Sequence, residues 1–231
     1  MKIAGWQKVS MVDYPGKIAT VLFTPGCNFN CYYCHNRELI HPTDSLIGMD
    51  EEEVLSYIYK RKGMIDALVL SGGEPTLQKG MAEFIEKAKS TGILIKLDTN
   101  GSRPDVIKDL LDRRLLDFVA MDIKAPFHKL MQIIGISADQ SKINESIRII
   151  MDQAPDYEFR TTVSPDLTKQ DLLDMASLIK GAKSYALQQY KRPECDYNDS
   201  RLDTEPHEFG FFTECKALLE AFVKKVEIRG F

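Results

Sequence analysis

The strongest constraint on the fold is a regular alternation of short apolar segments with longer segments of helical periodicity. Six apolar segments read as strands, at residues 18–23, 67–70, 93–97, 118–121, 157–163 and 185–190. The segments between them place apolar residues three and four positions apart, as one buried face of a helix requires. Alternation of this kind predicts a parallel sheet with right-handed crossovers. Six units are too few for a closed eight-stranded barrel, so the pattern predicts an α/β protein with an open sheet or a partial barrel.

Length and composition favour a single globular domain spanning residues 1–231. The net charge of −4 gives no electrostatic reason to expect a nucleic-acid partner. No apolar run approaches the roughly 20 residues of a membrane span, and the N-terminal segment lacks the apolar centre of a signal peptide. We therefore expect a cytoplasmic protein without a membrane partner. A last helix is expected near residues 208–223, and the sequence VEIRG after it is a candidate for a short terminal strand.

Unusual residues follow four of the predicted strands, each time at the point where the strand ends. A cysteine-rich loop at 27–34 follows the first strand, and Gly-Gly-Glu-Pro at 72–75 follows the second. Asp-Thr-Asn-Gly at 98–101 follows the third, and Asp-Ile-Lys at 122–124 follows the fourth. Ligands of α/β proteins bind where the carboxyl ends of parallel strands meet. The sequence therefore predicts one shared pocket at this edge of the sheet.

The chain contains five cysteines, and an odd count without a secretory signal argues against a disulfide framework. Three of them, Cys27, Cys31 and Cys34, follow a C-x3-C-x2-C spacing. An iron–sulfur cluster held by three thiolates would leave one iron open to another molecule. Structural zinc would need a fourth ligand from elsewhere, and three unligated thiols would be exposed to oxidation. Cys195 and Cys215 lack metal-like spacing and read as ordinary thiols.

The string CNFNCYYC, with Tyr33 directly before the third cysteine, resembles the signature of the radical S-adenosylmethionine (SAM) superfamily. Gly72-Gly73-Glu74-Pro75 is similar to the glycine-rich SAM motif of that superfamily. The longer stretch VDYPGKIATVLFTPGCNFNCYYCHN resembles activating proteins for anaerobic ribonucleoside-triphosphate reductase, within the wider group of glycyl-radical-enzyme activating enzymes. The resemblance extends over almost the whole chain, and it implies the incomplete (βα)6 TIM-like barrel of radical SAM enzymes.

This resemblance also implies the cofactors and the partners. Cys27, Cys31 and Cys34 would hold a 4Fe–4S cluster whose open iron is chelated by the amino and carboxylate groups of SAM. Reductive cleavage would give methionine and a 5′-deoxyadenosyl radical, which takes hydrogen from a glycine of a partner glycyl-radical enzyme. The reductase would be that partner, and a flavodoxin or ferredoxin would supply the electron. His35 is expected to pack the loop, because the cluster needs its open iron.

The resemblance assigns cofactor contacts to residues around the second strand end and the cysteine loop. Gly72 and Gly73 would let the backbone approach the methionine amino group, which a Cβ would hinder. Glu74 would orient that group or hold the turn. Tyr33 would contribute to cofactor binding beside the third cysteine.

The other strand ends supply charged candidates. Asp98, Thr99 and Asp122 match positions associated in related activating enzymes with a monovalent cation beside SAM. Lys124 would pair with the SAM carboxylate or with one of the aspartates, and it joins the three cysteines as a catalytic candidate. Arg160 would do the same through a bidentate contact.

Each charged or polar candidate also has a structural alternative. Asp98 and Asn100, which we count among the cofactor-binding residues, have the alternative of capping a turn and the following helix. Lys124 has the alternative of a solvated surface charge, and Arg160 that of pairing with a structural acid.

One strand end departs from the family pattern. Several activating enzymes end the sixth strand in a Pro-Tyr-His string that contacts SAM, whereas this chain reads Gln-Gln-Tyr-Lys at 188–191. Gln189 and Lys191 are therefore candidate substitutes. The polar stretch at 191–206 that follows is interpreted either as a contact with the partner enzyme or as a surface loop.

Overall fold

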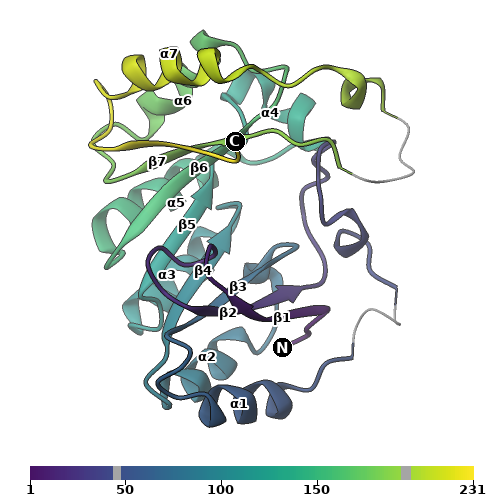
Figure 1. The fold of residues 1–231 in the computed structure, drawn as a ribbon, viewed down its shortest axis with the longest axis vertical. Coiled ribbons are helices and arrows are strands. Elements are labelled where there is room, and N and C mark those ends of the chain that lie inside the picture. Colours follow the sequence, from purple (N-terminus) through teal and green to yellow (C-terminus); the bar gives the residue numbers. More distant parts are fainter. Residues whose placement is uncertain (44–47, 194–198) are drawn as a thin grey trace.

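A computed structural model describes residues 1–43, 48–193 and 199–231, so Cys195 lies outside the described residues. The described chain forms one eight-stranded sheet in which the strands follow their order in the sequence (Figure 1). The strands are β1 (Gly5–Ser10), β2 (Ala19–Thr24), β3 (Ala67–Gly72), β4 (Leu94–Thr99), β5 (Phe118–Asp122), β6 (Tyr157–Val163), β7 (Tyr185–Gln189) and β8 (Val226–Arg229).

The sheet is parallel from β2 to β8, and only β1 is antiparallel to its neighbour β2. Because β1 and β8 are the first and last strands of the order, the sheet stays open and the two termini lie at opposite edges (Figure 1). Strands β2 to β7 are each followed by a helix, which confirms the six repeated units and the incomplete barrel.

Seven α-helices connect or flank the strands in the described chain. They are α1 (Glu51–Lys60), α2 (Met81–Lys89), α3 (Pro104–Asp112), α4 (Phe127–Ile134), α5 (Gln140–Gln153), α6 (Lys169–Leu178) and α7 (Phe209–Leu219). Three short 3-10 turns accompany them: η1 (Arg37–Leu39), η3 (Pro75–Leu77) and η4 (Ser200–Asp203).

Local sequence explains where several helices begin. The carboxylate of Asp50 accepts a hydrogen bond from the Glu52 amide at 3.0 Å at the start of α1. Proline opens α3, where no intrahelical donor is needed, and Thr168 forms a reciprocal capping box with Asp171 at the start of α6. None of the helices in the described residues is both long and apolar enough to cross a membrane.

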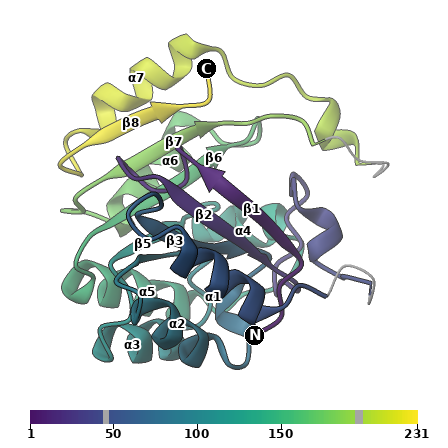
Figure 2. The ribbon, with the colours of Figure 1, turned by 60° about the horizontal axis from the view of Figure 1, so that its bottom comes forward.

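The two faces of the sheet are packed differently, because side chains alternate along each strand. Leucines of β2, β3 and β4 lie beside one another in register and pack in the large core shared with the helices, which surround that side of the sheet (Figure 2). The opposite face carries small residues, Ala19, Ala67 and Ala120, covered by Tyr14. Lys96 is buried on this second face, in register with Phe118 of β5.

Two elements were not predicted from the sequence, and one suggestion was confirmed. Strand β1 carries three exposed residues in its middle, so its apolar pattern is weak, and it is defined by its pairing with β2. Helix α4 is short and directly follows the Asp-Ile-Lys segment, where no separate helix was expected. The terminal sequence VEIR does add a strand, β8, parallel to β7.

Candidate functional site

A cavity lies at the carboxyl ends of β2 to β6 and is covered by the loop that follows β2. The space inside it, part of which is open to solvent, has a volume of about 870 Å³. All the candidate site residues except Gln189 and Lys191 line this cavity: Cys27, Cys31, Tyr33, Cys34, Gly72, Gly73, Glu74, Asp98, Thr99, Asn100, Asp122, Lys124 and Arg160. The predicted convergence of the strand ends is therefore confirmed.

The cysteine loop is held in place by the carboxyl end of α4. The Asn30 amide donates to the Ile134 carbonyl at 2.8 Å, and the Tyr32 amide donates to the Ile133 carbonyl at 3.3 Å. These carbonyls belong to the last turn of the helix and have no intrahelical partner. Gly26 adds a third anchor, because its amide donates to the Leu39 carbonyl at 2.6 Å. Helix α4, which the sequence analysis did not predict, therefore fixes the position of the cysteine loop through these hydrogen bonds.

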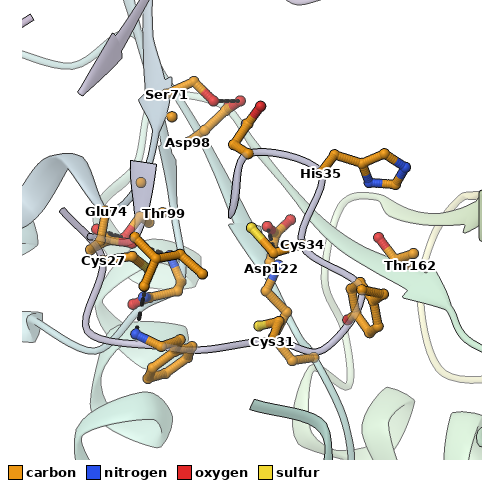
Figure 3. A pocket seen from close by; sticks show the side chains of 18 of the residues that line it. Cys27, Cys31, Cys34, His35, Ser71, Glu74, Asp98, Thr99, Asp122 and Thr162 are labelled. Carbon is orange, nitrogen blue, oxygen red and sulfur yellow. Dashed lines mark hydrogen bonds and ion pairs between the residues drawn. The ribbon is translucent and has the colours of Figure 1, made fainter. Parts of the chain in front are cut away.

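The three thiols lie in the same loop but at different positions around the cavity. Cys31 and Cys34 lie near Asp122, whereas Cys27 lies beside Glu74 and Thr99 (Figure 3). Among the described residues, no three cysteine, histidine or acidic side chains converge closely enough to hold a metal ion. Burial raises the pKa of Cys27 to about 12 and also raises that of Cys31. These thiols are therefore protonated at neutral pH, and a bound metal would be needed to stabilise the thiolate form.

The residues present fit a thiolate-ligated cluster. Three soft sulfur donors belong to one irregular loop and face one cavity, and iron–sulfur clusters are held by cysteine thiolates. The buried hydroxyl of Tyr33 makes no hydrogen bond to any described residue, so it is available to a bound ligand. Cys215 lies buried in α7 and outside the cavity lining, which removes it as a fourth zinc ligand. His35 is exposed and lines the cavity, so the expectation that it packs the loop was wrong.

The two glycines at the end of β3, Gly72 and Gly73, have a different reason for being glycine than the one predicted. A Cβ on Gly73 would lie 2.1 Å from the carbonyl oxygen of Gly26. Gly72 has a φ of +106°, and a Cβ there would lie 2.4 Å from the Thr24 amide nitrogen. The space that a side chain would need is thus filled by the backbone of β2 and of the cysteine loop. The glycines let two strand ends pack against each other, and this packing sets the floor of the cavity.

Glu74 is buried, and its carboxylate links the end of β3 to the end of β4 by hydrogen bonds. Its Oε1 accepts from the Thr76 amide at 3.2 Å, the Thr76 hydroxyl at 2.5 Å and the Thr99 hydroxyl at 2.7 Å. Its Oε2 accepts from the Asn100 amide at 2.7 Å. Burial raises the pKa of Glu74, and the hydrogen bonds oppose that rise. Of the two predicted roles, the geometry supports holding the turn.

Asp98 and Asp122 form an ion-pair network at the ends of β4 and β5. The Arg160 Nε lies 2.9 Å from Asp122 Oδ1, and its Nη1 lies 3.3 Å from Asp98 Oδ2. The Lys124 Nζ donates to Asp122 Oδ2 at 2.9 Å. Burial would raise the pKa of Asp122, but the Arg160 and Lys124 charges outweigh it and lower that pKa to about 2. Arg160 thus bridges two carboxylates on neighbouring strand ends. It pairs with acids of the protein, as the structural alternative expected, and it also lines the cavity.

Lys96 completes this network, and sequence reasoning missed it. Its Nζ donates to Asp98 Oδ1 at 2.7 Å and to the Asp13 carbonyl at 2.6 Å, and the side chain is 2% exposed. Burial would raise the pKa of Asp98, but Arg160 and Lys96 lower it below its usual value. The available signal was its spacing, because a lysine two residues before Asp98 on the same strand must share its face.

The polar residues after β4 mostly serve the turn itself. Thr99 donates its hydroxyl to Glu74 and accepts the Gly101 amide at 3.1 Å. The Asn100 side chain donates to Asn28 Oδ1 at 3.0 Å and accepts the Ser102 amide at 2.9 Å. The cation site at Asp98, Thr99 and Asp122 stays a prediction, because all three side chains already have protein partners that a cation would have to displace.

The candidate substitutes on the sixth predicted strand do not reach the site. Neither Gln189 nor Lys191 lines the cavity, and the Gln189 side chain donates to the His207 carbonyl at 2.9 Å. Strand β6 contributes Thr162 instead, two residues after Arg160 and on the same face. Ser71 was also missed, and its hydroxyl donates to Asp98 Oδ2 at 3.1 Å. The register of β3 against β4 and that of β6 against β5 decide these contacts, and neither register is visible in the sequence.

Comparison with known proteins identifies the family and relatives that this chain resembles. A family model described as the radical SAM superfamily matches residues 21–179. A protein of Methanocaldococcus jannaschii, MJ1227, whose name marks it as a candidate glycyl-radical enzyme activating enzyme, is 36% identical over 203 residues, covering 85% of this chain and 82% of the relative. The pyruvate formate-lyase-activating enzyme of Clostridium pasteurianum is 26% identical over 193 residues, covering 79% and 78% of the two chains.

Solved structures share the fold at low sequence identity. The QueE structure from Escherichia coli superposes with a TM-score of 0.56 at 12% identity, covering 100% of this chain and 94% of QueE. Streptococcus suis SuiB bound to its precursor peptide gives a TM-score of 0.65 at 12% identity, covering 91% of this chain and 48% of SuiB. At such identities the likeness concerns the fold alone, and it agrees with the open α/β barrel described above.

Proposed function

Because this chain belongs to the radical SAM superfamily and, within it, to the glycyl-radical-enzyme activating family, we propose that it installs a glycyl radical on anaerobic ribonucleoside-triphosphate reductase. Enzymes of this superfamily use a 4Fe–4S cluster and SAM, and so does this one. The observation that carries the proposal is the convergence of three loop thiols and four strand ends on one cavity. The choice of the reductase rests on the likeness of the stretch at 12–36 to activators of that enzyme.

Cys27, Cys31 and Cys34 would hold the cluster. When bound, the cluster supplies the electron that cleaves SAM into methionine and a 5′-deoxyadenosyl radical, which takes a hydrogen atom from glycine. The protein orients the reactants and limits the access of water. The buried ring of Tyr33 forms part of the wall beside the thiols.

The charged residues provide a site of mixed sign for SAM, which carries a sulfonium, an ammonium and a carboxylate. The partly buried cations of Lys124 and Arg160 are positioned to bind the carboxylate, since both line the cavity. Asp98 and Asp122 balance the positive groups of the ligand. The pKa of Lys124 lies well above its usual value, because the nearby Asp122 charge outweighs the effect of burial. Both members of this pair therefore stay ionised across the physiological range.

The partner must present a glycine Cα–H to a cavity that is open to solvent on one side. The exposed side chains of His35 and Asn36 line that cavity, so a segment of another protein can reach it. Five cysteines leave only two beyond the loop triad, too few for a second cluster with four cysteine ligands. We therefore propose that the enzyme holds a single cluster. We also propose that it works in the cytoplasm and that a flavodoxin or a ferredoxin reduces it.

Anaerobic reconstitution tests the activity. Protein containing iron and sulfide is incubated with SAM, dithionite and purified reductase, and we expect a glycine-centred doublet in electron paramagnetic resonance. Cys27→Ala should abolish both the doublet and 5′-deoxyadenosine formation. Cys215→Ala should preserve both, because Cys215 is buried in α7 and does not line the cavity. Formation of 5′-deoxyadenosine without a doublet would point instead to a small-molecule or peptide substrate.

A partner comparison tests the finer assignment. Pyruvate formate-lyase replaces the reductase in a parallel reaction, and the initial rates of doublet formation are compared. We expect the reductase to be favoured by at least about tenfold. A doublet on pyruvate formate-lyase alone would refute the partner while leaving the radical chemistry intact. Replacing dithionite by flavodoxin or ferredoxin then identifies the competent donor.

A further inference from the structure

A segment far along the chain contacts the cysteine loop directly. The guanidinium carbon of Arg201, in η4, lies 4.1 Å from the ring centre of Tyr32. Tyr32 stands between Cys31 and Cys34, directly after the former. A guanidinium at this distance over an aromatic face is a cation–π contact. The loop is therefore contacted by a segment about 170 residues away in the sequence.

The Arg201 guanidinium is fixed by other partners before it meets the ring. It forms a two-pronged ion pair with Asp199, with Nε to Oδ1 at 2.9 Å and Nη2 to Oδ2 at 2.5 Å. Its Nη1 donates to the Gln132 carbonyl at 2.6 Å, at the carboxyl end of α4. A planar donor that is held at both edges keeps its face toward the ring. Lysine could not reproduce this arrangement.

Tyr32 is anchored on its other side by the loop that follows β6. Its hydroxyl donates to Asp166 Oδ2 at 2.6 Å, and the Lys129 Nζ donates to the Asp166 carbonyl at 2.9 Å. The ring is 2% exposed. Tyr32 is thus held by three contacts: its amide bonds to α4, its hydroxyl bonds to Asp166, and the face of its ring packs against Arg201.

The carboxyl end of α4 brings these contacts together. Three successive carbonyls, of residues 132, 133 and 134, accept from Arg201, from the Tyr32 amide and from the Asn30 amide. A cation at this end of a helix is also favoured by the helix dipole. One helix end therefore holds both the cysteine loop and η4, and Arg201 closes the contact between them.

We propose that Arg201 is a positioning residue for the cysteine loop. It fixes the half of the loop that carries Cys31 and Cys34, so that both thiols face the cavity before a cluster is bound. Preorganised ligands lower the entropy that ordering the loop would cost on binding. The inference uses the role of the loop in holding the cluster and is independent of which partner enzyme is activated. The alternative is that Arg201 secures only its own segment.

Hydrogen exchange of the apoprotein separates these two roles. We expect R201Q to speed exchange of the amides in residues 27–36 by about tenfold, because a partly desolvated cation–π contact and a charged hydrogen bond are lost together. R192Q is the matched control: Arg192 pairs with Asp203 in the neighbouring sequence at 2.9 Å and is 64% exposed. It should leave exchange at 27–36 unchanged. Faster exchange confined to η4 in R201Q would overturn the proposal.

Two further measurements guard against a trivial result. In reconstituted holoprotein, R201Q should lose iron to a chelator about tenfold faster than the wild type, and R192Q at the wild-type rate. If R201Q does not fold, R201K carries the comparison, since it retains the charge and loses the fork to Asp199 and Gln132. R201Q should accelerate exchange at 27–36 less in a Y32L background than in the wild type, because Y32L has already removed the cation–π contact and leaves only the Arg201–Gln132 hydrogen bond to be lost. Additive acceleration in the double variant would refute a direct clasp.

Discussion

Replacing Lys96 by methionine tests the ion network that supports the site. Lys96 is 2% exposed and lies on the same face of the sheet as Phe118, with which it is in register. Its ammonium bonds to Asp98 at 2.7 Å and to the Asp13 carbonyl at 2.6 Å. Methionine has a similar length but carries neither the charge nor the hydrogen-bond donors of the ammonium. The substitution therefore isolates the contribution of the buried ammonium.

The expected magnitude follows from what Asp98 retains. Removing one member of a buried ion pair typically costs 3–5 kcal/mol, since the other charge is left without compensation. Asp98 keeps the Ser71 hydroxyl at 3.1 Å and the Arg160 guanidinium at 3.3 Å, so we expect the lower end, about 3 kcal/mol. In a chain of 231 residues this corresponds to a decrease in Tm of about 6–12 °C.

The assay is urea and thermal unfolding of the anaerobic apoprotein, followed by circular dichroism. Lys108→Met is the control: Lys108 pairs with Asp112 at 2.6 Å but is 49% exposed, so about 0.5 kcal/mol or less is expected. The difference between K96M and the wild type should narrow at acidic pH. The pKa of Asp98 lies below its usual value in the wild type, and a protonated Asp98 no longer needs the ammonium. A loss in K96M no larger than in K108M would refute the reasoning.

Three other substitutions follow from the same geometry. Gly73→Ala should destabilise the protein by about 3 kcal/mol and abolish SAM cleavage, because a Cβ would lie 2.1 Å from the Gly26 carbonyl oxygen. The control Gly181→Ala, which has open space and a φ of +87°, should cost about 1 kcal/mol and keep the activity. Denaturant midpoints measure the two losses of stability, and 5′-deoxyadenosine yields measure the activity. Glu74→Gln should cost about 2 kcal/mol in denaturant unfolding, since its amide cannot accept all four donors, and an unchanged midpoint would contradict that. The pKa of Asp122 in the folded protein is lowered to about 2, so the stability that its ionised form contributes is present above pH 4 and is lost as the pH falls toward 2. Between these pH values, the free energy of unfolding of Asp122→Asn should fall by about 2 kcal/mol less than that of the wild type. If the free energy of unfolding falls equally steeply with pH in both proteins, Asp122 is excluded as the group responsible.

The residues of the site were accessible from the sequence because they follow strands directly. Cys27, Gly72, Asp98 and Asp122 each lie at or just after the end of an apolar segment, and parallel strands bring such ends to one edge. The cysteine spacing and the repeated strand–helix units likewise depend on neighbours in the chain. This is why the cavity and most of its lining were predicted.

The roles of those residues depend on distances between segments, and the sequence does not contain them. Glu74 was placed in the site, but its four donors come partly from the next strand end, 25 and 26 residues away. Gly73 is required because of the backbone of Gly26, which only the packing of two loops brings near. Strand β1 was missed because its apolar pattern is weak and its pairing with β2 defines it. Helix α4 was missed because it is only eight residues long, although Leu130, Ile133 and Ile134 have helical spacing.

What the sequence by itself determined is therefore the chemistry available at one edge of an open α/β barrel. Periodicity and spacing are local properties, and they fix which groups stand at the strand ends. The tertiary structure decided which of those groups face the cavity unpaired and which are bound to one another. Arg160 against Asp98 and Arg201 against Tyr32 are such decisions, since strand register and helix packing set distances that no short stretch of sequence encodes.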